Sequence, residues 1–139
     1  MTATKLTRCH CVNLRRAAKH VTDYYDRAIE PGGITLSQFS LLRNLDMLGQ
    51  SNTTTLAERL CLDRTTLVRN LKPLLENGLV ADMASKGRRD RMLRLTPEGK
   101  NTLETCLPLW EEANGTISAA IGPERSGDFE NTLRRLLDV

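Results

Sequence analysis

A run of polar side chains near the middle of the chain has the chemistry needed to read nucleic acid. Between residues 64 and 76 the leucines and Val68 recur at helical spacing, so the residues between them fall on the opposite helix face. Those residues carry hydroxyl, amide, guanidinium and ammonium groups, which hydrogen-bond to base edges and phosphate oxygens. We expect bases to meet Thr65, Thr66, Arg69 and Asn70, and phosphates to meet Arg64 and Lys72.

A second group of cations lies between two short apolar segments, 79–83 and 92–95, that can pair as strands. This pattern predicts a basic β-hairpin, or wing, whose cations contact phosphates or the minor groove. These cations are Lys86, Arg88, Arg89 and Arg91. From residue 64 to 94 there are eight Lys or Arg and three acidic residues, a net charge of +5, whereas the whole chain carries +3. The positive charge is therefore concentrated on these two elements.

The preceding residues predict the support for the polar helix. Thr55 and Glu58 have the spacing of a capping box for a first short helix, and Asp63 can cap the second. Gly78 ends the second helix, because glycine adopts the left-handed cap conformation without steric cost. Two capped helices joined by a tight turn predict a helix-turn-helix.

At this point the chain resembles the MarR family of bacterial transcription regulators. The resemblance lies in LAERLCLDRTTLVRNLKPLLENGLV and GRRDRMLRLTPEGK, and Ile34-Thr35, Gln38-Phe39 and Leu41-Leu42 fit the same pattern. It implies a winged helix-turn-helix over residues 35–96 that binds double-stranded DNA. Two positions depart from the family: Gly87 replaces an acidic residue two positions before Arg89, and Cys61 stands at a turn position often held by glycine.

Amphipathic helices are predicted on both sides of this unit. The first spans about residues 6–30, Thr35 or Ser37 caps the next, and Thr96-Pro97 opens a long helix that Pro108 should bend. Gly122-Pro123 separates the long helix from a last one, about 124–137. The sequence thus predicts a single, mostly α domain (1–139): a winged helix-turn-helix with a two-stranded wing, and a helical dimerisation region in 6–30 and 97–139.

These outer helices are too few to cover their own apolar stripes within one chain, which predicts a two-fold homodimer. Such a dimer presents two recognition helices to successive major grooves and requires an inverted-repeat operator. The predicted function is a cytoplasmic transcription regulator, a repressor released by a small molecule or an oxidant. The alternative is a winged helix that binds an acidic protein and not DNA.

Cys9-His10-Cys11 is the most unusual local motif. One interpretation is a solvated start of the first helix. Another follows from the organic-peroxide sensors of the MarR family, in which a reactive cysteine lies fourteen positions before a tyrosine, as Cys11 does before Tyr25. Tyr25 would then hydrogen-bond a Cys11 thiolate across the dimer. Those sensors have a second tyrosine where this chain has Arg15.

The other candidate signal is a small phenolic acid, which MarR-like proteins bind between the dimer helices and the winged helix. Here the lining would draw on Arg16, His20, Tyr24, Arg43 and Trp110. A metal site at Cys9, His10, Cys11 and His20 is the weaker alternative, since adjacent helical positions point in different directions. We therefore predict no metal and no cofactor.

Composition limits the remaining function classes. No nucleophile-and-base pair, carboxylate pair or phosphate loop is evident, so we predict no enzyme. There is no run of eighteen apolar residues and no signal-peptide centre, so no membrane association is expected. In the cytoplasm the four cysteines would be reduced thiols, with Cys61 and Cys106 serving as packing residues.

Overall fold

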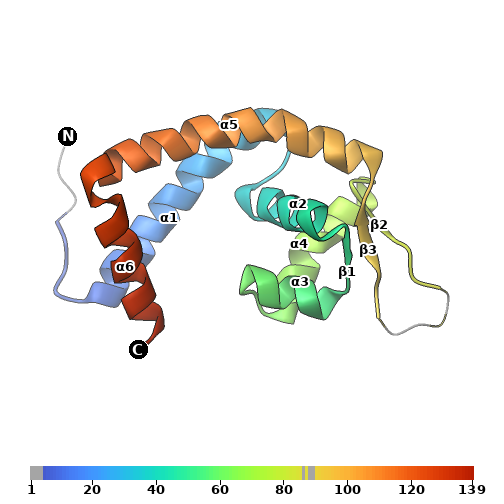
Figure 1. Cartoon of the computed structure of the whole chain (residues 1–139), viewed down its shortest axis with the longest axis horizontal. Helices are drawn as coiled ribbons and strands as arrows, with labels where there is room; N and C mark the ends of the chain where they lie inside the picture. Colours follow the sequence, from blue (N-terminus) through green and yellow to red (C-terminus); the bar gives the residue numbers. More distant parts are fainter. Residues whose placement is uncertain (1–4, 86, 88–89) are drawn as a thin grey trace.

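The computed structural model describes residues 5–85, 87 and 90–139. Its α-helices are α1 (His10–Ile29), α2 (Leu36–Leu48), α3 (Thr53–Leu60), α4 (Arg64–Glu76), α5 (Pro97–Ile121) and α6 (Ser126–Leu137). Its strands are β1 (Gln50–Ser51), β2 (Val80–Asp82) and β3 (Leu93–Leu95), and short 3-10 turns span Glu30–Gly32 and Pro123–Arg125. Figure 1 shows α5 as an arch that connects α1 and α6 at one end to α2, α3, α4 and the sheet at the other.

The winged helix forms around one apolar core. Leucines from α2, α3 and α4 meet there with Val80 and Leu93 of the sheet, and all of them are buried. The core continues along α5 through Leu103 and Cys106, as predicted for Cys106. A Cβ on Gly32 would overlap the sulfur of Cys106, so the turn after α1 depends on glycine at this position.

The sheet contains the predicted two-stranded wing and one further strand. Strands β2 and β3 pair antiparallel, with Ala81 opposite Arg94, which confirms the hairpin. In addition, β1 pairs with the other edge of β3, giving the order β1-β3-β2, so the sheet has a third strand outside the wing. Strand β1 was not predicted, because a two-residue strand is too short to show an alternating pattern.

Most predicted helix caps are confirmed. Thr35 forms a capping box with Gln38 on α2, Asp63 caps α4, and Thr96 caps α5. The predicted capping box of Thr55 and Glu58 is wrong: Asn52 caps α3, and its side-chain oxygen accepts the backbone N–H of Thr55 at 2.7 Å. Both residues can cap, but Asn52 starts the helix at Thr53, three residues before the start at Leu56 that a Thr55 cap would set.

The outer helices expose much of their apolar surface. Every residue of α6 is exposed except the half-buried Ser126, and the first half of α1 is exposed apart from the half-buried Asn13. The exposed apolar side chains at this end are Leu6, Val12, Leu14, Phe129, Leu133, Leu136 and Leu137. In the described part of the chain, no helix combines the length and the apolar character required to cross a membrane.

Candidate nucleic-acid interface

Helix α4 presents the predicted polar face to solvent at its N-terminal half. Arg64, Thr65, Arg69 and Lys72 are exposed, as a contact with DNA requires. At the start of the helix, Asp63 accepts the backbone N–H of Thr66 at 2.7 Å and its hydroxyl at 3.0 Å. These hydrogen bonds hold the pKa of the Asp63 carboxyl below its usual value.

Two of the predicted base-reading residues are less accessible than the others. Thr66 is half-buried and its hydroxyl already donates to Asp63. Asn70 is also half-buried. Thr65 and Arg69 are therefore the most accessible of the four side chains that were predicted to meet bases.

The placement of Val68 with the buried leucines is wrong. Val68 is 41% exposed and lines an apolar hollow of about 310 Å³ between α4 and the wing, together with Leu71, Leu75 and Arg91. The error arises because Val68 directly follows Leu67 and therefore lies about 100° around the helix from it, outside the buried leucine stripe.

The root of the wing is held by a carboxylate. Asp82 accepts the backbone N–H groups of Ala84 at 3.0 Å and Met92 at 3.1 Å, which bridges the two sides of the hairpin. Arg91 is exposed beside this bridge. The other three predicted wing cations, Lys86, Arg88 and Arg89, lie outside the described residues.

The turn of the helix-turn-helix explains the family's preference at position 61. Cys61 ends α3 with φ +53°, in the left-handed region that favours glycine, and it is the only non-glycine residue with a positive φ in the described part of the chain. Its backbone N–H donates to the carbonyl of Glu58 at 3.2 Å. The cysteine side chain is exposed, so the prediction that Cys61 is a packing residue is wrong.

The predicted signal residues fall into two groups. Cys9, Cys11 and Arg15 are exposed at the start of α1. Arg16 and His20 are also exposed and line a hollow near the N-terminus with Lys5, Leu6, Asn13 and Ala17.

The second group lies where α1 and α2 meet α5. The Arg43 guanidinium lies 4.7 Å from the centre of the Trp110 ring, and Trp110 stacks on Phe39. Tyr24 is half-buried, and Tyr25 is buried with its hydroxyl donating to Asn114 at 2.6 Å. The single chain thus divides the predicted lining: Arg43 and Trp110 lie together, and Arg16 and His20 lie along the hollow near the N-terminus.

Some contacts had no signal in the sequence. The Lys100 ammonium on α5 donates to both carboxylate oxygens of Asp46 on α2, at 3.0 and 2.9 Å, and this bond raises the pKa of Lys100. Asn114 as the partner of Tyr25 was also missed. Within the residues that the structure describes, no three His, Cys, Asp or Glu side chains are grouped so as to hold a metal ion.

Comparison with known proteins decides what this arrangement is. A model of the MarR family matches residues 34–89. The transcriptional regulator MosR of Mycobacterium tuberculosis, solved in complex with DNA, is 34% identical; the match covers 94% of this chain and 98% of MosR, with a TM-score of 0.79. The chain belongs to the MarR family.

Other MarR-like structures share the fold. The repressor CouR, bound to a 23-mer DNA duplex, is 25% identical over 96% of this chain and 99% of its own, with a TM-score of 0.83. PcaV of Streptomyces coelicolor, in complex with its natural ligand, is 23% identical over 100% and 99%, with a TM-score of 0.85, and shows likeness of fold. No curated protein sequence matches significantly. As a MarR-family member the chain is a DNA-binding transcriptional regulator, which decides against a protein-interaction module that does not bind DNA.

Proposed function

We propose that this protein is a dimeric repressor that binds an inverted-repeat operator and releases it in response to a chemical signal. The observation that carries the proposal is the exposed polar face of α4, with Arg64, Thr65, Arg69 and Lys72 free of the core. Thr65 and Arg69, with Thr66 and Asn70 beside them, read base edges in the major groove. Arg64, Lys72 and the wing cations Lys86, Arg88, Arg89 and Arg91 contact phosphates or the minor groove. CouR and MosR, both bound to DNA, support this assignment.

The homodimer is supported by the apolar surface left open on α1 and α6. Phe129 and Leu133 are both exposed on α6, and the exposed Leu14 of α1 lines a hollow together with Leu136 of α6. Residues 6–30 and 97–139 form the dimerisation region, and 35–96 form the DNA-binding part. A two-fold axis between these helices repeats the α4 face at a fixed separation, so each copy enters one major groove.

Two signals are compatible with the site. The Arg43–Trp110 pair lies at the joint between the helical region and the winged helix, where a small phenolic ligand would contact a cation and a ring together. PcaV, solved in complex with its natural ligand, supports a small molecule as the signal. An oxidant acting on Cys11 is the second signal, supported by the exposure of both Cys9 and Cys11.

The test is binding of the full-length protein to the DNA upstream of its own gene, followed by fluorescence anisotropy over a range of salt concentrations. We expect affinity to fall steeply as salt rises, since phosphate contacts release counterions. Peroxide and phenolic acids are then added separately. Release by peroxide from wild type but not from Cys11→Ser identifies the oxidant signal. Failure to retain any upstream fragment at low salt would reject the proposal.

A further inference from the structure

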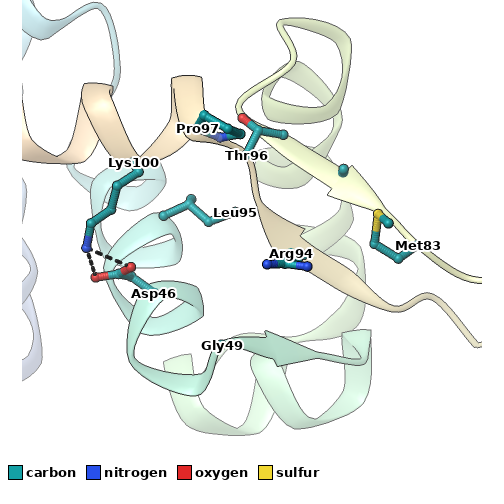
Figure 2. A pocket seen from close by; sticks show the side chains of 9 residues that line it. Asp46, Gly49, Met83, Arg94, Leu95, Thr96, Pro97 and Lys100 are labelled. Carbon is teal, nitrogen blue, oxygen red and sulfur yellow. Dashed lines mark hydrogen bonds and ion pairs between the residues drawn. The ribbon is translucent and has the colours of Figure 1, made fainter.

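A hollow of about 520 Å³ lies at the root of the wing, on the side of the sheet away from α4. We call it the wing-root hollow; it is lined by Asp46, Gly49, Ala81, Met83, Arg94, Leu95, Thr96, Pro97 and Lys100. Its volume falls within the roughly 300–1,000 Å³ typical of small-molecule sites. Figure 2 shows the Lys100–Asp46 pair on one side and Arg94 with Met83 on the other. Arg43 and Trp110 are not part of its lining.

The charges of the lining favour an anion. The Asp46 carboxylate is occupied by the ammonium of Lys100, with both of its oxygens accepting hydrogen bonds. Arg94 is exposed, and among the described residues no carboxylate forms an ion pair with its guanidinium. One cation therefore remains uncompensated, and a guanidinium binds a carboxylate through two parallel hydrogen bonds.

The rest of the lining favours an apolar body beside that anion. Met83 is 60% exposed, and Ala81, Leu95 and Pro97 surround the same space with carbon. Methionine side chains adapt to ligand shape and pack favourably on rings. A free phosphate or other inorganic anion would leave this surface uncovered, whereas an organic acid would cover it.

We propose that the wing-root hollow binds a small carboxylic acid with an apolar body, its carboxylate on Arg94 and its body against Met83 and Pro97. The lining comes from α2, both strands of the wing and the first turns of α5. A ligand held there ties β3 to the helix that leads to the dimerisation region. The effect of this ligand on DNA affinity rests on the proposed function, whereas the binding of the ligand to the hollow does not.

The binding test uses the full-length protein without DNA, titrated with benzoate and followed by amide chemical shifts. Benzamide serves as the neutral analogue of nearly the same shape. We expect benzoate to shift signals of residues 81–83 and 94–100, and benzamide to bind at least tenfold more weakly. Shifts confined to residues around Arg43 and Trp110 would overturn the proposal.

Three variants test whether the Arg94 guanidinium holds the carboxylate or whether the loss of any exposed arginine has the same effect. Arg94→Gln should lower benzoate affinity at least tenfold, and Arg94→Lys, which keeps the charge but loses the two parallel hydrogen bonds, should fall between Arg94→Gln and wild type. Arg125→Gln removes an exposed arginine elsewhere and should bind as wild type does. Because Arg94 is exposed, all three should unfold at the wild-type temperature. Equal affinity of Arg94→Gln and wild type would overturn the assignment.

The regulatory step is measured separately, as affinity for upstream DNA with and without saturating benzoate. We expect at least a threefold change in wild type and none in Arg94→Gln. An unchanged affinity in wild type that has bound benzoate would overturn the coupling to the wing. A protein that binds no upstream DNA would reject the proposed function and leave the benzoate titration decisive for the site.

Discussion

The Tyr25 hydroxyl on α1 donates a hydrogen bond of 2.6 Å to the side-chain oxygen of Asn114 on α5. Burial raises the pKa of the Tyr25 phenol, so the group stays protonated and able to donate at neutral pH. A phenol has a single hydrogen to donate. Cys11 lies fourteen residues earlier in the same helix, about 21 Å away at 1.5 Å per residue. Pairing of Tyr25 with a Cys11 thiolate therefore requires the second chain and the loss of the Asn114 bond.

Replacement of Tyr25 by Phe should lower the free energy of unfolding by about 0.5–1.5 kcal/mol, because the Asn114 oxygen loses its donor in a half-buried site. Chemical denaturation measures the change. Tyr24→Phe is the matched control, since among the described residues the Tyr24 hydroxyl has no hydrogen-bond partner within the protein. Equal stabilities of Tyr25→Phe and wild type would show that the bond contributes nothing.

The cap of α4 should make stability depend on pH in the acid range. The pKa of Asp63 is lowered in the folded protein by the hydrogen bonds from Thr66, so its contribution is present above the unfolded pKa of about 4 and disappears as pH falls through the folded pKa. Melting temperatures of wild type and Asp63→Ala should differ above pH 4 and converge well below it. A difference that persists unchanged at pH 2 would contradict this mechanism.

Local signals in the sequence were sufficient for most elements. Thr35, Asp63 and Thr96 each cap a helix through a backbone group only three residues away, so the pattern that predicts them is contained in a short window. The same window led to the wrong cap for α3, Thr55 in place of Asn52, because both side chains can accept from a first turn. The cap is determined by where the chain before α3 lies, and that position depends on the pairing of β1 with β3.

Contacts between distant segments were not predictable in this way. Tyr25 and Asn114 are separated by 89 positions, and Lys100 and Asp46 by 54. Each pair depends on how α5 crosses the other helices, and helical periodicity carries no information on the crossing. The family resemblance supplied the general plan of the winged helix, and the wing-root hollow appears only where the sheet, α2 and α5 are assembled.

Arg69 and Lys72 should affect DNA binding in different ways. Arg69→Ala should cost about 1–3 kcal/mol on the operator and much less on unrelated DNA, because a base contact carries sequence information. Lys72→Ala should weaken binding to both and reduce the salt dependence by about one phosphate contact. Arg27→Ala, an exposed arginine on α1, is the control. Anisotropy titrations on both DNAs make the comparison; an equal loss for Arg69→Ala on the two would place Arg69 on phosphate.

The apolar face of α6 should determine the oligomeric state. Leu133→Asp puts a charge into the proposed dimer interface, where an unpaired carboxylate would lose its hydration, so we expect a monomer with unchanged helix content. Leu133 is already exposed in the single chain, which is why the fold should persist. Asn131→Asp introduces the same charge two residues away on the same exposed helix and should remain dimeric.

Light scattering coupled to gel filtration measures the mass of each variant, and circular dichroism measures its helix content. A dimeric Leu133→Asp protein would exclude this face of α6 from the interface, and a wild-type monomer would exclude the dimer itself.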